Sequence, residues 1–311
     1  MDRRRALGLC ALVGLALLAG CSAAGSIDLR EGDDATLAAG ASRSFGAGDG
    51  PPTDADRAPS AVVAAAVANG STTVNGTDPP VTEGLPIEHA GAYFDLTWTV
   101  VDRRPATMVD VGVDYNASRT TGADGTTGGG DAIAYEDLPA PDREALAGLF
   151  PPPPEPPRTR GVDFGVGAVY TDAELNRSVL APTQTVDAVV YGGTRYPIET
   201  RGTRQVTAKT YRYTADRVAP NASAYAAHLR ERYLFTLSNL TDAERSVLEE
   251  AATSGSYYAD SPDDAAFESV LERFRAHRAV VETESSGTWI VRYDGQVYLA
   301  QLDYGGFVED G

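Results

Sequence analysis

The residue types that most often perform catalysis or bind metal ions are scarce in this sequence. The three histidines lie far apart and lack the i, i+4 spacing of a zinc pair on one helix face. They are His89, His228 and His277. No Gly-Lys-Ser/Thr phosphate loop and no Gly-x-Ser-x-Gly nucleophile turn occurs. The acid pairs Asp54/Asp56 and Asp263-Asp264 lack the ligand spacing of a calcium loop. We therefore predict no catalytic residue, no metal ligand and no cofactor.

The N-terminus predicts export and lipid attachment. Arg3–Arg5 are followed by an uncharged stretch, Ala6–Gly20, whose 15 residues are too few to span a hydrocarbon core of roughly 30 Å comfortably. This pattern is typical of a signal peptide, here residues 1–20. Leu18-Ala19-Gly20-Cys21 resembles the lipobox of prokaryotic lipoprotein precursors. The resemblance implies cleavage before Cys21 and a lipid joined to its thiol.

Export itself follows one of two routes. Arg4-Arg5-Ala6-Leu7 resembles a loose twin-arginine motif, and the general secretory route stays open beside it. Cleavage after residue 20 removes one acid and three arginines, so the net charge changes from -18 to -20. It also removes Cys10 and leaves no unmodified thiol for redox or nucleophilic chemistry. With two cysteines in all, a disulfide scaffold and a Cys-rich zinc site are excluded.

Every asparagine lies in an Asn-x-Ser/Thr sequon. The six are Asn69, Asn75, Asn116, Asn176, Asn221 and Asn239. Ser and Thr make up about 45 of the 311 residues, so six matches by chance are a roughly one-in-10^5 event. We predict a glycosylated surface with all six side chains exposed, because a glycan must face solvent.

The chain is strongly acidic and almost without lysine. Asp and Glu number 44 against 26 Lys and Arg, and Lys209 is the single lysine. This excess argues against a protein that binds nucleic acid through a basic surface. The composition resembles that of proteins from halophilic archaea. That resemblance implies a carboxylate-rich surface suited to concentrated salt, where charge repulsion is screened within about 3 Å at 1 M.

The composition changes near residue 88. Residues 21–88 are rich in Ala, Gly, Ser, Thr, Pro and Asp, which predicts a flexible, partly glycosylated tether. Two α+β modules are expected after it, over residues 89–204 and 205–311. Each would combine strands, two or three amphipathic helices and a closing β-hairpin.

The last hundred residues carry the clearest local signals. Thr241-Asp-Ala-Glu244 is a capping box, and Asp294-Gly295 predicts a type I′ hairpin turn. Pro262 is expected at the first position of a helix. Four apolar residues would form the core face of that helix: Phe267, Val270, Leu271 and Phe274. Strands are predicted over Ala92–Val101 and Gln205–Asp216, and helices over Asp142–Leu149 and Ala222–Leu237.

Two motifs recur at one spacing and predict an internal duplication. Leu138–Leu146 matches Leu240–Leu248, and Tyr191–Tyr196 matches Tyr293–Tyr298, each 102 residues later. Two separate motifs in one register are harder to attribute to chance than either alone.

The stretch Tyr211–Tyr304 resembles a module of haloarchaeal surface proteins of unassigned role. The resemblance is carried by Ser238–Arg245, Phe274–His277 and Trp289–Tyr298. It implies a haloarchaeal lipid-anchored surface lipoprotein and no particular activity.

These observations lead to a functional expectation with two alternatives. We expect a non-catalytic, glycosylated protein on the extracellular face of the cell membrane, with a structural or binding role in the envelope. Its partners would be the membrane, through a lipid on Cys21, and other envelope proteins. The alternatives are an exported hydrolase that uses carboxylate chemistry, with a site built from Asp, Glu, Tyr and Arg and without metal, and a solute-binding lipoprotein of a transporter.

Overall fold

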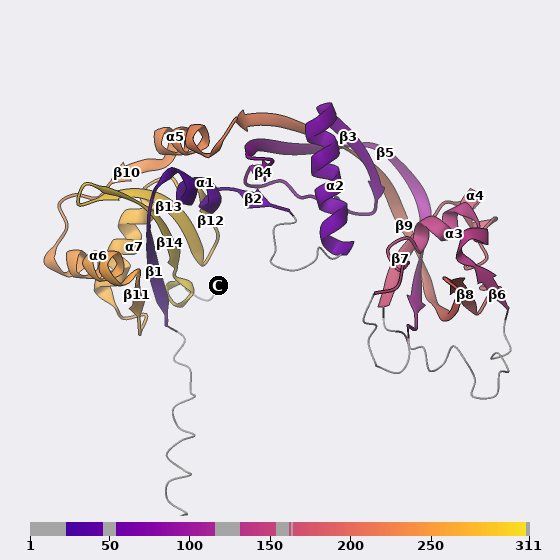
Figure 1. The fold of residues 1–311 in the computed structure, drawn as a ribbon. Coiled ribbons are helices and arrows are strands. Elements are labelled where there is room, and N and C mark those ends of the chain that lie inside the picture. Colours follow the sequence, from indigo (N-terminus) through magenta and orange to yellow (C-terminus); the bar gives the residue numbers. More distant parts are fainter. Residues whose placement is uncertain (1–22, 46–53, 116–130, 154–161, 163, 309–311) are drawn as a thin grey trace, which may run out of the picture. The chain divides into compact units, whose positions relative to one another are not determined.

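The computed structural model describes residues 23–45, 54–115, 131–153, 162 and 164–308, with the backbone alone for 54–58. The described chain has the predicted α+β character and divides into two compact units (Figure 1). Unit 1 comprises the described parts of Met1–Ser44, Gly84–Asp95 and Asp216–Gly311, and unit 2 those of Phe45–Glu83 and Leu96–Ala215.

Unit 1 is built on a largely antiparallel sheet in the order β10-β13-β14-β1-β11, in which only the β10–β13 pair is parallel. A short strand, β12, also pairs with β13. Its strands are β1 (Gly25–Glu31), β10 (Leu234–Thr236), β11 (Ser256–Ala259), β12 (Val281–Glu282), β13 (Ser286–Tyr293) and β14 (Gln296–Asp303). Its helices are α1 (Asp34–Gly40), α5 (Ala222–Tyr233), α6 (Asp242–Ser254) and α7 (Ala265–Arg275).

Helices cover both faces of this sheet. Because successive side chains of a strand point to opposite faces, Trp289 and Ile290 of β13 enter different clusters. Trp289 packs with α6 and α7, where Phe267 and Phe274 are fully buried. Ile290 packs with α1 and α5 around Leu37. The sheet is therefore the middle layer of unit 1.

Unit 2 contains most of two long strands, β5 (Ala92–Val113) and β9 (Thr194–Ala219), whose ends at 92–95 and 216–219 belong to unit 1. The strand order of this sheet is β2-β4-β5-β9-β8-β6, and β3 also pairs with β9, and β7 with β5. The shorter strands in unit 2 are β3 (Ser71–Gly76), β6 (Ala132–Ala134), β7 (Phe164–Tyr170) and β8 (Ala188–Tyr191), while β2 (Arg43–Ser44) and β4 (Ile87–His89) belong to unit 1. The helices are α2 (Asp54–Asn69), α3 (Ala140–Ala145) and α4 (Asp172–Leu175).

The two units share one topology. The order β10-β13-β14-β1-β11 in unit 1 corresponds to β6-β8-β9-β5-β7 in unit 2. Along the chain, β1, β10, α6, β11, α7 and the β13–β14 hairpin follow the same sequence of elements as β5, β6, α3, β7, α4 and the β8–β9 hairpin. In unit 1 β10 is parallel to β13, and in unit 2 its counterpart β6 is parallel to β8.

The registers agree as well. Ala132 pairs with Ala188, and Leu234 pairs with Ile290, so both partners differ by 102 positions (234 − 132 and 290 − 188). The hairpin turns Gly192-Gly193 and Asp294-Gly295 keep the same spacing, and all four residues have positive φ, as a type I′ turn requires. Topology, register and turns thus support the predicted duplication.

Each unit also buries one carboxylate at the corresponding position of a helix. Asp142 accepts hydrogen bonds from Tyr170 Oη at 3.0 Å, Ser178 Oγ at 2.6 Å and the Val179 amide at 2.8 Å. Its counterpart 102 residues later is Glu244. In both units the carboxylate joins its helix to a segment further along the chain.

Glu244 has three kinds of partner. It accepts from the Thr241 amide at 2.7 Å, which confirms the predicted capping box. It also accepts from Ser269 Oγ at 2.7 Å and from Arg273, at 2.6 Å to Nε and 3.0 Å to Nη2. These bonds fix α6 against α7.

The predicted tether over 21–88 is wrong for the part that the structure describes. β1 lies between β14 and β11, and Ile27 is fully buried there. α1, α2 and β3 follow within the same stretch. The composition was misleading because β1 is ordered by pairing with strands far away in the sequence. No local signal reveals that pairing.

The predicted domain boundaries also need correction. The boundary at 204/205 falls inside β9, a continuous strand from Thr194 to Ala219. The boundary at 88/89 falls inside β4. Both units are discontinuous in sequence, which contiguous ranges cannot represent.

Several local predictions hold with shifted ends. The hairpin around Asp294-Gly295 is present, and the four predicted core residues of α7 are buried. The strands predicted at 92–101 and 205–216 lie within β5 and β9. α5 ends at Tyr233, where β10 begins, and α3 covers Ala140–Ala145.

The predicted start of α7 at Pro262 is wrong. Asp264 is the N-cap, and its carboxylate accepts from the amides of Ala266 and Phe267. An acidic cap thus outweighs the proline signal.

The role of Glu244 gives a first prediction. Glu244→Gln should lower the free energy of unfolding by about 2 kcal/mol at neutral pH, because a neutral amide loses the charge-assisted bonds with Arg273. Glu250→Gln changes an exposed residue of the same helix and should shift it by less than about 0.5 kcal/mol. Chemical denaturation of both variants measures the difference.

The pH dependence of that difference tests its electrostatic origin. The Arg273 hydrogen bond, opposed by burial, lowers the pKa of Glu244 from 4.5 to about 2. A carboxyl with a lowered folded-state pKa stabilises the fold above its unfolded pKa, and that stabilisation is lost as the pH falls toward 2. The gap between wild type and Glu244→Gln should therefore be full above pH 5 and shrink below 4.5. A gap that stays constant down to pH 2 contradicts the prediction.

Candidate binding surfaces

A groove in unit 1, the tyrosine groove, runs between α6 and the β13–β14 hairpin. Its volume is about 460 Å³. It is lined by Leu237, Arg245, Glu249, Ala252, Thr253, Tyr293, Asp294 and Tyr298. Four of the lining residues come from the helix, whose capping box and core face set the direction of their side chains: Arg245, Glu249, Ala252 and Thr253.

The groove joins an aromatic and aliphatic lining to a charged rim. Arg245 is held at the rim, where it donates to Asp242 Oδ1 at 3.0 Å and to the Leu240 carbonyl at 3.2 Å. Burial, and then the nearby charge of Glu249, raises the pKa of Tyr293, so its hydroxyl stays protonated at neutral pH. Tyr293 is buried in the core of unit 1, so the half-buried Tyr298 is the tyrosine whose ring is partly accessible in the groove.

A second hollow of unit 1, the α5 cleft, has a volume of about 380 Å³. Asp95 and Arg232 contribute opposite charges to its lining, and His228 contributes an imidazole ring. Beside it the Tyr233 ring carries two guanidinium groups, with Arg232 at 5.6 Å and Arg278 at 5.3 Å from the ring centre. These cation–π contacts occupy the aromatic face that a ligand would otherwise use.

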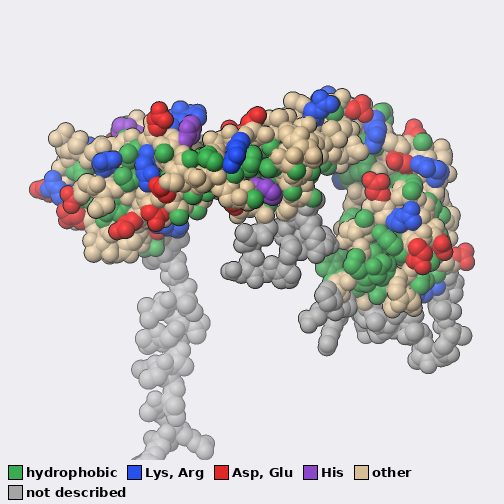
Figure 2. Space-filling view, turned by 45° about the horizontal axis from the view of Figure 1, so that its top comes forward, with side chains coloured by type: hydrophobic (Ala, Val, Ile, Leu, Met, Phe, Trp, Pro, Cys, Tyr) green, Lys and Arg blue, Asp and Glu red, His purple; other side chains and the backbone are tan. Residues whose placement is uncertain are grey.

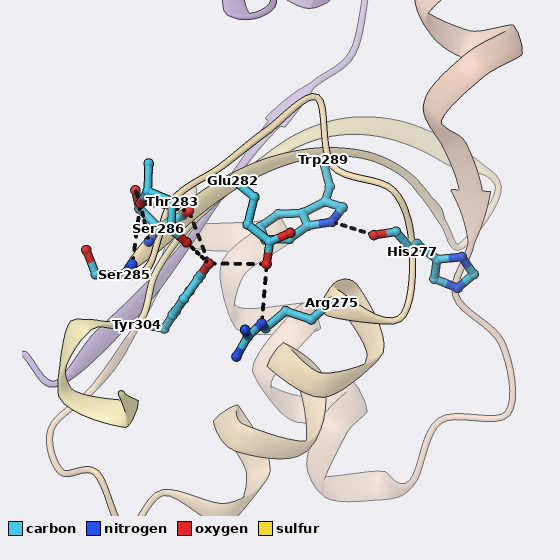
Figure 3. Close-up of polar contacts among 8 residues, drawn as sticks. All are labelled: Arg275, His277, Glu282, Thr283, Ser285, Ser286, Trp289 and Tyr304. Carbon is cyan, nitrogen blue, oxygen red and sulfur yellow. Dashed lines mark hydrogen bonds and ion pairs between the residues drawn. The ribbon is translucent and has the colours of Figure 1, made fainter. Parts of the chain in front are cut away.

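A third cluster unites Glu, Arg and Tyr, the residue types of the alternative hydrolase. Figure 3 shows Tyr304 pointing toward Glu282 and toward the turn between Thr283 and Ser286, with Arg275 beside it. Tyr304 Oη lies 3.0 Å from the Thr283 carbonyl, 3.1 Å from the Ser286 carbonyl and 3.5 Å from Glu282 Oε1. A phenol has one proton, so these three acceptors share it.

The contacts of this cluster hold the turn that leads into β13. Arg275 Nε lies 3.3 Å from Glu282 Oε1, and its guanidinium stands over the Tyr304 ring at 5.4 Å. Burial raises the pKa of Tyr304, whose side chain is fully buried. The Trp289 indole N–H donates to the His277 carbonyl at 3.3 Å, which ties β13 to the residues that follow α7.

The structure separates the sequence-predicted sites. Cys21 and Asn116 lie outside the described residues. The other five predicted glycosylation sites are exposed, as expected, and they are distributed over both units. They are Asn69, Asn75, Asn176, Asn221 and Asn239.

The histidines take separate places. His89 lies in β4, and His228 lines the α5 cleft. His277 follows the end of α7 and stacks on Phe235, with the ring centres 4.0 Å apart. In the part of the chain that the structure covers, no three His, Cys, Asp or Glu side chains gather closely enough to hold a metal ion. Asp264, a member of the acid pair Asp263-Asp264, is the N-cap of α7.

Comparison with known proteins gives no relative. No protein-family model matches the chain, and neither a curated protein nor a solved structure matches it. Across the described ranges, no helix is both long enough and apolar enough to cross a membrane.

Sequence analysis missed these two hollows of unit 1, the tyrosine groove and the α5 cleft. The tyrosine groove could have been found from the duplicated Tyr191–Tyr196 and Tyr293–Tyr298 motifs, because they place two tyrosines at matching positions of two hairpins. The α5 cleft brings residues 84–86 and 95 beside α5 and residues 280–281, and no local pattern signals that contact.

The structural role of the Tyr304 cluster gives a second prediction. Tyr304→Phe should lower the free energy of unfolding by about 1 kcal/mol, because the turn carbonyls lose their donor while the ring remains. Tyr258→Phe, at an exposed tyrosine of the same unit, serves as the control and should have no effect. Equal denaturation midpoints for Tyr304→Phe and wild type would mean that the hydroxyl does not hold the turn.

Proposed function

We propose that this chain is a non-catalytic, glycosylated, lipid-anchored protein of the extracellular cell surface with a structural or binding role in the envelope. The observation that carries the proposal is the exposure of all five described sequon asparagines, on both units. A protein that displays acceptor sites around its surface suits an extracellular position, where glycans add to its solvation.

The lipobox and the fold together support an anchor close to the folded protein. Only Ser22, Ala23 and Ala24 separate Cys21 from the first residue of β1. At about 3.5 Å per residue, the four steps from Cys21 to Gly25 reach at most about 14 Å. A lipid on Cys21 would therefore hold unit 1 near the bilayer, with no long tether between them. Because one acyl chain binds weakly, stable attachment requires two chains or an archaeal-type diether lipid.

The sequons differ in whether the hydroxyl group of their Ser or Thr also stabilises the fold. Ser178 donates to Asp142, Ser223 donates to Asp34, and Thr241 caps α6. These three hydroxyl groups have structural roles that are independent of glycosylation. The sequons of Asn69 and Asn75 therefore provide the cleaner test, since Asn69 ends α2, Asn75 lies in β3, and both are exposed.

The surface charge suits a salt-rich exterior. On the face shown in Figure 2, acidic side chains are interspersed with arginine and lysine side chains. In concentrated salt their mutual repulsion is screened within a few ångströms, and the carboxylates remain hydrated. The binding role in the proposal is supported by the tyrosine groove, which offers an aromatic lining to a partner.

The anchor gives the third prediction. Cys21→Ser should release the protein from the membrane fraction and leave the precursor uncleaved, because serine has no thiol to receive the lipid. Cys10→Ser removes the other cysteine of the signal region and should stay membrane-bound. Fractionation and intact-mass measurement in the native host report both results. Membrane retention of Cys21→Ser would refute the anchor.

The glycans give the fourth prediction. Peptide mapping of the native protein should show hexose-bearing additions at Asn69 and Asn75. Ser71→Ala removes the first sequon without changing its asparagine, so the peptide with Asn69 should lose its addition while that with Asn75 keeps it. Unmodified masses for both wild-type peptides would refute glycosylation at these sites.

A further inference from the structure

The α5 cleft of unit 1 is lined by opposite charges that the fold does not use. Within the described residues, the side chains of Asp95 and Arg232 form no hydrogen bond and no ion pair, either with each other or with another residue. The same holds for His228, which lies four residues before Arg232 on α5. All three side chains are exposed. An acid and a base thus face one hollow of about 380 Å³ without neutralising each other.

Other arginines of unit 1 do have a carboxylate partner. Arg230, two residues before Arg232 on the same helix, lies 2.6 Å from Asp34 Oδ1. Arg273 of α7 lies 2.6 Å from Glu244 Oε1. The chain carries 44 acidic residues against 26 Lys and Arg, so acids are plentiful. Arg232 nevertheless makes no such pair in the described part of the chain, and its N–H donors are therefore available to a ligand.

An aromatic ring holds the guanidinium of Arg232 in place. This group lies 5.6 Å from the centre of the Tyr233 ring, and the guanidinium of Arg278 lies 5.3 Å from the same centre. A guanidinium that contacts a ring face keeps N–H groups at its edge, where they can donate to a carboxylate. Two cations beside one ring also repel each other, so a negatively charged ligand group is stabilised next to them.

Much of the remaining lining is aliphatic. Six residues form this wall: Leu85, Pro86, Val218, Leu229, Val280 and Val281. Val281 is 37% exposed, so the wall is open to a ligand on this side. Tyr225 also lines the cleft, but its hydroxyl donates to the Ala41 carbonyl at 2.7 Å and is already used. The wall can therefore cover an aliphatic side chain of a ligand and remove it from water.

We propose that the α5 cleft binds a small zwitterion with an aliphatic side chain, either a free amino acid or a dipeptide. Arg232 binds its carboxylate, Asp95 binds its ammonium group, and the aliphatic wall covers its side chain. His228 shares the helix face of Arg232 and adds a polar ring beside the carboxylate. The volume lies within the range of small-molecule sites, roughly 300–1,000 Å³.

The two cleft charges are what select a zwitterion. A ligand that carries only an anion would cover Asp95 without pairing it, and a ligand that carries only a cation would do the same to Arg232. Leaving a charged group desolvated and unpaired lowers affinity. The inference goes beyond the proposed function, because binding in the α5 cleft requires neither a lipid nor a glycan.

The first test compares ligands. Saturation-transfer NMR of the full chain in detergent measures the binding of L-leucine and of the dipeptide Leu-Leu. At least one should bind saturably, with a dissociation constant on the order of 0.1–1 mM for a ligand of this size, and the tighter one identifies the source. Three analogues of the tighter ligand should each bind at least fivefold more weakly. They are its C-terminal amide, its N-acetyl derivative, and glycine or diglycine, which lack the carboxylate, the ammonium charge and the aliphatic side chain, respectively.

The second test assigns each ligand charge to a residue. Arg232→Gln should weaken binding of the zwitterion several-fold and leave its C-terminal amide unaffected, because the amide offers no charge to Arg232. Asp95→Asn should weaken binding of the zwitterion and leave its N-acetyl derivative unaffected. These pairings form a double-mutant cycle that isolates each contact. Arg30→Gln and Glu250→Gln remove exposed charges outside the cleft and should bind as the wild type does.

Three outcomes would overturn the proposal. The first is the absence of saturable binding of both L-leucine and Leu-Leu. The second is equal affinity for the C-terminal amide and the N-acetyl derivative as for the zwitterion, which would make the cleft an apolar surface without charge recognition. The third is undiminished binding to Arg232→Gln or to Asp95→Asn. The ligand analogues need no variant, so the test stands even where a variant misfolds. Membrane release and glycan mapping, which test the proposed function, are independent of all three.

Discussion

The insertion of β1 into the sheet of unit 1 is the constraint on which the rest of the structure depends. β1 pairs with β14 over Ser26–Glu31 and with β11 over Gly25–Asp28, so a segment from the start of the chain joins strands from its end. Gly25 permits the close approach, because a Cβ at this position would lie 2.5 Å from the Phe267 ring. Without β1, the sheet would be divided between β14 and β11, and the apolar face under α6 and α7 would lose Ile27 and Leu29. The long loop that this pairing closes costs entropy, which the buried sheet has to offset.

Although the two units share one topology, they differ in how their strands follow one another along the chain. In unit 2 the strand that corresponds to β1 is β5, which is followed directly by β6. In unit 1 the whole of unit 2 lies between β1 and β10. Both units nevertheless have a buried carboxylate at the corresponding helix position, Asp142 in unit 2 and Glu244 in unit 1. Asp142 uses hydroxyl and amide donors, while Glu244, one methylene longer, reaches a guanidinium as well. The same position therefore fixes the helix in both units through different donors.

Local chemistry was predictable from the sequence, and long-range pairing was not. The capping box at Thr241 and the turn at Asp294-Gly295 need only neighbouring residues, and both are present. The duplication was readable from two motifs because register and turn type recur together. The strand at Gly25–Glu31 was only weakly signalled, since a seven-residue segment with two buried apolar side chains is ordered by partners more than 200 residues away. The error about residues 25–31 follows from that pairing, whereas the boundary errors at 88/89 and 204/205 arise because β4 and β9 run through those positions.

The candidate site shows the same division between local and distant information. Its tyrosines are visible in the duplicated motif, but the groove itself depends on how α6 packs beside the β13–β14 hairpin, which no local pattern reveals. The site is also coupled to the strand that follows Cys21. Tyr298 of the groove pairs in register with Glu31 of β1 across the β1–β14 ladder. β1, the strand that completes the sheet of unit 1, is thus also the direct neighbour of the strand that carries Tyr298 of the groove.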